Sequence, residues 1–325
     1  MTYPMPPLEL PDLREMNKLL LKCGAEIAEI NTIRKHLDGF KGGRLSKKIF
    51  PRRGFGLILS DVIGDPLEII ASGPTVPDPS TYSDVDRIMK KYELHDKIPK
   101  NIASILNDGL SGKIPETPKD TDPCFKSMTN ILIGSALLAE QTYEGYFEAK
   151  EIPSKKIETM EGEALDFGKK LANRLYSQDM TKGITKQICY ISSGEFTVTL
   201  TGNGVGGRNQ EMLLGFLIEE CKTMIENPEK YNEFGENFRY TFTSCAFDGL
   251  EGNSEAMGAI IDSATLGRIC DLLNAKNDDQ ILKYLEDTAK NNNSYELFSK
   301  LNDALVVGYT GTNVNDSLLL LITKN

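Results

Sequence analysis

The chain has 325 residues, of which 40% are hydrophobic and 26% charged, a composition typical of a globular protein large enough for two domains. Its formal net charge of −10 argues against nucleic acid as a partner, and no apolar run approaches the ~18 residues of a membrane helix. Six cysteines without a CxxC pair and only two histidines disfavour zinc and redox sites. Residues 1–11 lack the basic and apolar parts of a signal peptide, so we expect a cytoplasmic protein without membrane partners.

The first half of the chain alternates helical periodicity with short apolar runs. The run from Phe55 to Ser60 has the continuous apolar character of a buried strand, and the following Gly-Asp-Pro ends it in a loop. Residues 71–83 are predicted to form a loop, and a strand over residues 130–134 leads directly into a helix at Ser135. The other helices are predicted over residues 12–23 with an Asp12–Glu15 capping pair, over 26–37, from about Arg44, and over 82–92 and 100–108.

The polar stretch from Ser177 to Lys186 is the predicted domain boundary, because apolar periodicity stops there and strands resume at Ile188. We therefore expect domains over residues 1–180 and 186–325. The elements expected around and after the boundary are helices over 163–176 and 209–225, a strand pair over 188–192 and 196–201, and strands over 240–246, 304–308 and 318–323. This alternation predicts an α/β fold with two domains and mainly parallel or mixed sheets.

The most cationic stretch lies near the N-terminus. Gly42 and Gly43 precede a predicted helix start, where free N–H groups suit a phosphate or carboxylate, and Arg44 would add a bidentate clamp. The alternative is a solvated basic helix face. Asp38 is the one acidic residue between positions 34 and 53. The cations of this stretch are Arg34, Lys35, Lys41, Arg44, Lys47, Lys48, Arg52 and Arg53.

Three carboxylates follow predicted strands. Asp61 and Asp65 come after the strand that ends at Ser60, and Asp248 follows the strand over 240–246, at the sheet end where open α/β folds bind ligands. Such a carboxylate can accept a hydroxyl proton or hold magnesium against phosphate oxygens. The alternative is a set of turn-forming aspartates.

Residues 202–207 formally match GxGxxG between a predicted strand and a helix. A nicotinamide dinucleotide site is disfavoured, because Glu219 and Glu220 fall inside the long predicted helix rather than at the end of a following strand. A phosphate-cradling turn with Arg208 at the helix start and a tight packing turn both stay open. The loop of residues 310–316, with hydroxyls, amides and one carboxylate, can likewise bind a ligand or merely turn.

Five stretches, taken together and in order, resemble the glycerate kinases whose C-terminal part is the MOFRL domain. They are INTIRKHLDGFKGGRL (30–45), LSDVIGDPLEIIASGPTVPD (59–78), GNGVGGRNQE (202–211), FDG (247–249) and TGTNVND (310–316). The resemblance implies a partial Rossmann-like N-terminal domain and a C-terminal MOFRL α/β domain. It also implies ATP-dependent phosphorylation of D-glycerate, to 2-phosphoglycerate, with ATP and Mg²⁺ bound in a cleft between the domains.

Carried onto matching positions, the resemblance implies catalytic roles for Asp61, Arg208 and Lys35. It implies a base or metal-associated carboxylate at Asp61, and the position of Asp65 in the same loop adds it as a second predicted magnesium ligand. The implied contacts to substrate or phosphate are Arg34, Lys41, Gly42, Gly43, Arg44, Gly206, Gly207, Asn209, Asp248, Asn313 and Asp316. These residue types supply the cations and carboxylates that phosphoryl transfer requires.

The chain also departs from the family pattern. Family members begin with a longer segment that includes a lysine-bearing turn and an ISGGGS-like stretch, so we expect the first domain here to lack strands and its principal catalytic lysine. Phe247 stands where threonine is usual, and Tyr309 where proline is usual. The alternative function is therefore a catalytically impaired member that acts as a binding or regulatory subunit. A homodimer and a mitochondrial isoform are left open.

Overall fold

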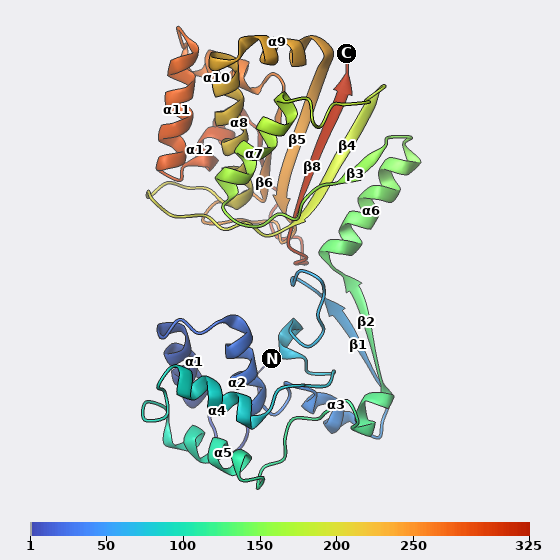
Figure 1. Ribbon diagram of the computed structural model, residues 1–325, viewed down its shortest axis with the longest axis vertical. Helices are drawn as coiled ribbons and strands as arrows, with labels where there is room; N and C mark the ends of the chain where they lie inside the picture. Colours follow the sequence, from blue (N-terminus) through green and yellow to red (C-terminus); the bar gives the residue numbers. More distant parts are fainter. Residues whose placement is uncertain (1) are drawn as a thin grey trace. The chain divides into compact units, whose positions relative to one another are not determined.

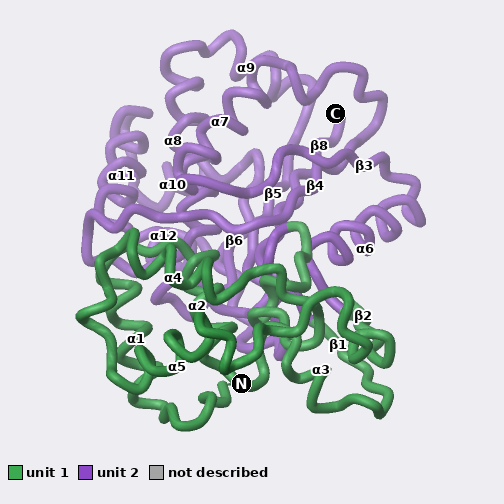
Figure 2. The backbone as a smooth tube through the Cα atoms, turned by 60° about the horizontal axis from the view of Figure 1, so that its bottom comes forward, with its two compact units in different colours: residues 1–58, 64–133 green, residues 59–63, 134–325 purple. Residues whose placement is uncertain are grey.

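The structure, a computed structural model, describes residues 2–325, which form two compact units (Figures 1 and 2). The first unit comprises residues up to 58 together with 64–133, and the second comprises residues 59–63 and 134–325. The predicted α/β fold class is confirmed. The predicted domain division near residue 180 is a different division from these packing units, and it stays a prediction.

The first unit is a helical cluster with a two-stranded sheet. Its apolar core is formed by α1 (Leu10–Lys22), α2 (Ile27–Leu37), α4 (Tyr82–Lys91) and α5 (Lys100–Leu110). The remaining elements are α3 (Arg44–Ile49), β1 (Gly54–Leu59), η1 (Ile70–Ser72), η2 (Pro123–Ser127) and β2 (Met128–Gly134). The predicted helices are thus confirmed, with one correction at the start of α1. Asp12 accepts the N–H of Glu9 at 2.9 Å, so Asp12 occupies the third helical position instead of the N-cap.

The prediction that β1 is a buried strand is wrong. Phe55 and Leu57 are 70% and 66% exposed, and alternate residues of β2, including Ile133, are exposed as well. The cause is tertiary: β1 pairs with β2 in a sheet of only two strands, and one apolar face of that sheet is left uncovered.

The second unit is built on a six-stranded sheet with the order β3-β4-β8-β5-β6-β7. β3 is parallel to β4, and the other neighbouring pairs are antiparallel, so the sheet is mixed, as predicted. The strands are β3 (Ser154–Lys156), β4 (Gln187–Gly194), β5 (Phe238–Ala246), β6 (Gly258–Asp262), β7 (Ala304–Leu305) and β8 (Asp316–Lys324). The central strand β8 is almost wholly buried between β4 and β5, which explains its continuous apolar run.

Helices cover both faces of this sheet (Figure 1). α6 (Ala136–Ala149) contacts β3, β4 and β8, whereas α8 (Arg208–Glu226) packs against β5 and β6 and against α7 (Ala164–Tyr176). The α7–α8 crossing needs small residues, because a Cβ at Gly168 would lie 1.9 Å from the Met212 carbonyl oxygen. The remaining helices are α9 (Pro228–Asn237), α10 (Thr265–Leu273), α11 (Asp278–Lys290) and α12 (Ser294–Leu301).

Two predictions for this unit are wrong. Residues 196–201 form no strand beside β4. They lie alongside the residues that begin α7, where Thr197 N–H donates to the Gly162 carbonyl at 2.8 Å. The strand predicted over 304–308 is limited to Ala304–Leu305, and β3, β6 and α9 were not predicted. Across residues 2–325, the structure contains no helix with the length and apolarity that crossing a membrane requires.

Candidate functional site

Three strand ends meet at one edge of the sheet in the second unit. Asp316, the first residue of β8, is aligned with Gly194 at the end of β4 and with Ala246 at the end of β5. Residues that directly follow β4 and β5, among them Glu195 and Asp248, therefore lie at the edge where β8 begins. Strand ends of this kind position polar side chains on a rigid scaffold, as ligand sites of α/β folds require.

Arg208 is held at this edge by two carboxylates. Its Nε and Nη2 donate to Asp316 Oδ2 and Oδ1 at 2.5 and 2.8 Å, and its Nη1 lies 2.9 Å from Glu195 Oε1. The hydrogen bond with Asp316 raises the pKa of Arg208, while burial raises the pKa of Asp316 against the effect of Arg208. Asp316 is fully buried and Glu195 is 51% exposed, so the guanidinium is a fixed charge with one accessible side.

The next residue, Asn209, links this ion pair to the start of α8. Its Nδ2 donates to Asp316 Oδ2 at 3.0 Å and to Glu251 Oε2 at 2.9 Å, and its Oδ1 accepts from Ser244 Oγ. Glu251 also accepts the backbone N–H groups of Asn209 and Gln210 at 2.6 and 3.1 Å. Burial raises the pKa of Glu251 to about 7, although these bonds oppose the rise. The N-terminus of α8 therefore already holds a carboxylate of its own chain.

The glycine-rich turn before α8 is packed against the rest of the unit. The N–H groups of Gly202 and Gly206 donate to the side-chain oxygens of Asn292 and Asn253, both at 2.9 Å. A Cβ at Gly204 would lie 2.5 Å from the Asn291 carbonyl oxygen. The turn thus has the tight packing that the sequence left open, and the amides of residues 202–206 are engaged. The predicted phosphate contacts of Gly206 and Gly207 stay predictions.

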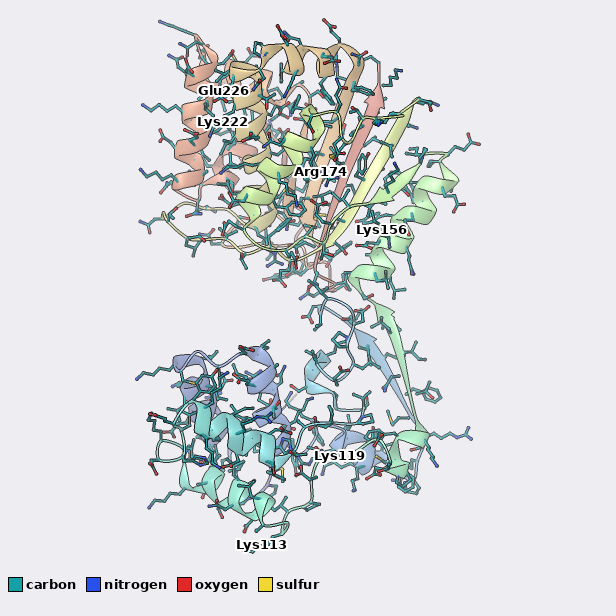
Figure 3. The ribbon with its side chains drawn as sticks, viewed as in Figure 1. Lys113, Lys119, Lys156, Arg174, Lys222 and Glu226 are labelled. Atoms are coloured by element: carbon teal, nitrogen blue, oxygen red, sulfur yellow. The ribbon has the colours of Figure 1, made fainter. Side chains whose placement is uncertain are left out.

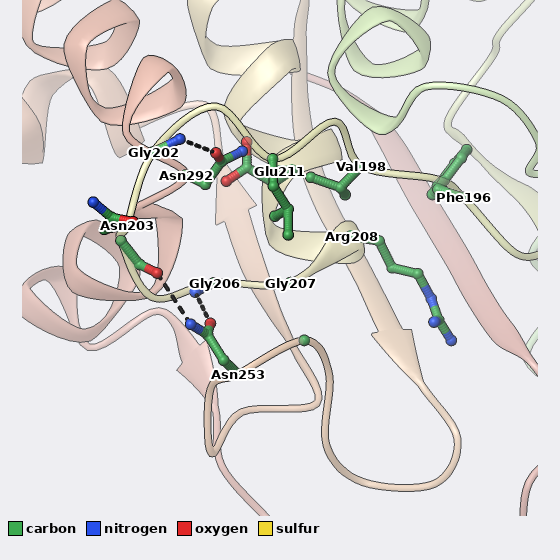
Figure 4. A pocket seen from close by; sticks show the side chains of 13 residues that line it. Phe196, Val198, Gly202, Asn203, Gly206, Gly207, Arg208, Glu211, Asn253 and Asn292 are labelled. Carbon is green, nitrogen blue, oxygen red and sulfur yellow. Dashed lines mark hydrogen bonds between the residues drawn. The ribbon is translucent and has the colours of Figure 1, made fainter. Parts of the chain in front are cut away.

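A pocket of about 540 Å³ lies beneath this turn (Figure 4). One side is formed by the extended segment 195–201 and the other by the first turn of α8 and residues 252–253. Glu211 lines the pocket from α8, and Arg208 lies at its edge.

The loop of residues 310–316 packs on the end of β5. Thr310 N–H donates to the Asp248 carbonyl at 3.2 Å, and Phe247 N–H donates to the Asn315 carbonyl at 3.0 Å. Asp248 and Asp316 are close enough that the charge of Asp248 contributes to the raised pKa of Asp316. The structure thus brings together four predicted residues from three separate motifs, namely Arg208, Asn209, Asp248 and Asp316.

In the first unit, the predicted cations are largely engaged by their own chain. Lys35 Nζ lies 3.3 Å from Asp78 Oδ1 in a buried pair, and Arg44 Nη1 donates to the carbonyls of Lys35 and Asp38 at the end of α2. Lys119, labelled in Figure 3, donates to the Asp78 carbonyl at 2.9 Å. These contacts make the cluster a structural network.

The predicted exposure of the Gly42 and Gly43 amides is wrong. Their N–H groups donate to the carbonyls of Ser72 and Gly73 at 3.0 and 2.8 Å, because the loop after η1 packs on this turn. The two glycines have φ values of +57° and +78°, which explains the need for glycine at these positions.

Arg34 and Lys41 share a groove of about 480 Å³ beside α1 and α2. Arg34 Nη2 donates to Asn17 Oδ1 at 2.5 Å, and Lys41 Nζ donates to the Ala71 carbonyl at 3.2 Å. Burial lowers the pKa of Lys41, with Arg34 adding to the decrease and Asp38 opposing it. Arg14 and Lys18 line the same groove, whose lining contains one carboxylate, Asp38, among the described residues. Its charge suits a small anion.

Asp61 and Asp65 lie in the turn after β1. Asp61 is exposed, and Asp65 has a left-handed backbone with φ +54° directly after Gly64. Among residues 2–325, no three His, Cys, Asp or Glu side chains are grouped as a metal cluster. Magnesium bound with a nucleotide needs only one or two carboxylates besides phosphate oxygens, and Asp61 offers a carboxylate of this type. Magnesium binding by Asp61 and Asp65 stays a prediction.

The sequence did not single out several residues of these clusters, namely Glu195, Glu211, Glu251, Asn253 and Asn292. Glu195 follows the carboxyl end of β4, so the positional rule used for Asp61 and Asp248 would have found it. Glu251 and the asparagines carry no local signal, because their partners lie 41–93 positions away.

Comparison with known proteins shows which family the chain belongs to. Residues 188–316 match the MOFRL family, and residues 1–107 match a domain of unknown function, DUF4147. The chain is 35% identical over 324 residues to the glycerate 2-kinase of Pyrococcus horikoshii, covering 98% of this chain and 66% of that protein. It is 35% identical over 323 residues to the D-glycerate 2-kinase of Thermotoga maritima, with coverages of 97% and 68%.

The crystal structure of glycerate kinase from Thermotoga maritima superposes with a TM-score of 0.81 at 31% identity, covering 99% of this chain and 70% of that one. The chain therefore belongs to the glycerate kinase family, as its motifs predicted. It spans about two thirds of the length of these relatives.

Proposed function

We propose that the protein is a glycerate kinase, which transfers the terminal phosphoryl group of ATP to D-glycerate and forms 2-phosphoglycerate. The observation that carries the proposal is the fixed guanidinium of Arg208, clamped by buried Asp316 at the sheet edge. Phosphoryl transfer depends on a positive charge that is already held in place beside the negative equatorial oxygens of the phosphoryl group. An arginine fixed by a bidentate pair supplies such a charge without reorganisation. The names of the relatives support the same reaction.

In this proposal, the phosphoryl oxygens take the place of Glu195 at Nη1 of Arg208. Glu195 is half exposed, so its release costs little, whereas Asp316 stays in place and keeps the guanidinium oriented. The groove with Arg34 and Lys41 binds the glycerate carboxylate. Asp61 accepts the proton of the attacking hydroxyl. Asp61 and Asp65 would hold magnesium, which would supply positive charge to the nucleotide phosphates. The proposed catalytic role of Lys35 requires that it exchange its contact with Asp78 for one with substrate.

The proposal extends to the setting of the protein. It acts in the cytoplasm on the small molecules D-glycerate and ATP, without nucleic acid or membrane as partners, and as a monomer or a homodimer.

The test is a coupled assay with D-glycerate and MgATP. Formation of ADP is followed with pyruvate kinase and lactate dehydrogenase, and the product is added directly to enolase, which accepts 2-phosphoglycerate but not the 3-phosphate. We expect turnover in both assays. ADP formation without an enolase signal would contradict the assigned hydroxyl, and no ADP above a heat-inactivated sample would overturn the kinase proposal.

A second candidate is a catalytically impaired family member that acts as a binding or regulatory subunit. The uncovered apolar face of β1 and β2, with Phe55 and Leu57 exposed, favours it, because such faces are used in association. D-glycerate binding measured by calorimetry, without ADP formation in the coupled assay, would favour this candidate over the kinase.

A further inference from the structure

The pocket beneath the glycine-rich turn has one apolar wall. Residues 195–201 are extended, and their backbone is tied to the start of α7 by Thr197 N–H on the Gly162 carbonyl and Thr199 N–H on the Glu163 carboxylate, at 2.8 and 3.1 Å. Phe196, Val198 and Leu200 alternate along this segment and all line the pocket. Figure 4 shows the first two of these side chains. A wall of this kind suits the face of a flat, largely apolar group.

The opposite wall carries one buried carboxyl group. Glu211 is 3% exposed and lines the pocket from the first turn of α8. Its Oε1 accepts from Ser294 Oγ at 3.0 Å, whereas its Oε2 has no hydrogen-bond partner within residues 2–325. Oε2 keeps some access to solvent, because the fully buried side-chain atoms without a partner in residues 2–325 do not include it. A ligand in the pocket can therefore replace water on this oxygen.

The protonation of Glu211 sets which ligand edge it matches. Burial raises its pKa to about 7, the Glu163 charge adds to the rise, and the Ser294 bond opposes it. Near neutral pH the group is therefore protonated in a large share of molecules, and a protonated carboxyl both donates and accepts a hydrogen bond. Adenine presents a matching pair on one edge, the amino group as donor and N1 as acceptor. Guanine presents two donors there, which an ionised carboxylate matches instead.

We propose that this pocket binds the adenine base of the nucleotide, with the Glu211 carboxyl on the amino edge and the 196–200 wall against the ring face. The inference rests on the proposed kinase function and deepens it, because it assigns the base of the phosphoryl donor to the second unit. Arg208, at the pocket edge and one turn before Glu211 on α8, is then the charge nearest the phosphates.

The experiment measures MgADP and MgGDP binding to the full chain by calorimetry, independently of turnover. Val198→Trp fills the pocket, and we expect at least a tenfold loss of ADP affinity. Leu272→Trp introduces the same side chain at an exposed position of α10, outside the pocket, and should bind ADP as the unaltered chain does. Thermal unfolding of both variants verifies that each is folded.

Glu211→Gln and Glu211→Leu supply a second, milder pair. The amide keeps one donor and one acceptor, so ADP binding should persist and the preference for ADP over GDP should rise. Leucine removes both groups and should weaken ADP binding about tenfold. Unchanged ADP affinity in both Val198→Trp and Glu211→Leu, or no ADP binding by the unaltered chain, would overturn the inference. ADP binding that responds as expected, in a chain without turnover, would overturn the kinase proposal and leave the pocket assignment standing.

Discussion

The two units use their cations in different ways. In the first unit, Lys35 is buried against Asp78 and Arg44 donates to backbone carbonyls, so the highest density of positive charge in the sequence mostly stabilises the fold. In the second unit, a single arginine, Arg208, is held by buried Asp316 and keeps a side toward half-exposed Glu195. The contrast shows that charge density alone does not locate a ligand site. A cation serves a ligand when its buried partner orients it and its accessible partner can be replaced.

The largest effect expected from this contrast is on stability. Lys35→Met leaves the carboxylate of Asp78 in the interior without its cation, and Asp78 Oδ2 already has no partner among the described residues. Burial tends to raise the pKa of Asp78, but bonds from Ser80 and the charge of Lys35 outweigh it and lower the pKa. We expect the free energy of unfolding, measured with urea, to fall by about 3–5 kcal/mol.

Two controls sharpen this result. Lys47→Ala breaks a surface pair with Asp122 in the same unit and should cost less than ~1 kcal/mol. Adding Asp78→Asn to Lys35→Met should recover part of the loss, because the neutral amide needs no cation. Equal losses for Lys35→Met and Lys47→Ala would show that the buried pair has no special role.

The next effect is on turnover. Arg208→Lys keeps the charge but loses the planar fork that fits both oxygens of Asp316, so we expect kcat to fall by about 10²–10³ with a smaller change in KM. Arg268→Lys is the matched control, because Arg268 also bridges two carboxylates, Asp262 and Asp303, in the same unit. Similar losses of kcat in both variants would mean that Arg208 acts only through stability, which urea unfolding of each would reveal.

The periodicity of the sequence predicted most elements of both units, because helix and strand patterns are local. It failed where exposure depends on distant partners: the apolar run of β1 was taken for a buried strand, yet only tertiary pairing decides whether Phe55 and Leu57 are covered. The strand predicted over residues 196–201 was wrong for the same reason, since their backbone partners belong to the start of α7.

The site was predicted unevenly for a related cause. Arg208 and Asp316 were both named from motifs, but their contact spans 108 positions and has no local sign. Glu251 was missed altogether, although it satisfies the first amides of α8 and positions Asn209. Motifs identify residues with special chemistry, whereas the residues that orient them are found only once the chain is folded.

A third prediction concerns the core of the second unit. Glu220 lies fully buried between the hydroxyls of Tyr176 and Tyr240, at 2.5 and 2.7 Å, and burial raises its pKa from 4.5 to about 7. At a pH between these two pKa values, Glu220 therefore carries a proton in the folded chain and has lost it in the unfolded chain. Stability should fall as pH rises from about 5 to about 8, because folding is then linked to proton uptake.

Glu220→Gln removes this contribution and should flatten the dependence by about 2 kcal/mol over that range, since one pKa unit corresponds to about 1.4 kcal/mol. Glu211 and Glu251, whose pKa values are also raised to about 7 by burial, keep the remaining slope. Urea unfolding at about pH 5 and about pH 8 measures the difference. A slope identical to that of the unaltered chain would place the proton elsewhere.

The smallest effect tests how the glycine-rich turn is held. Asn253 is exposed, accepts the N–H of Gly206 at 2.9 Å and donates to the Gly204 carbonyl at 3.1 Å. Asn253→Ala should lower the free energy of unfolding by only about 1 kcal/mol, because water can replace an exposed partner. Amide hydrogen exchange at Gly206 should nevertheless accelerate, since its N–H loses its acceptor. If exchange at Gly206 stays as slow as in the unaltered chain, the bond to Asn253 does not protect this N–H, and the other contacts of the turn, such as that of Gly202 with Asn292, hold it in place.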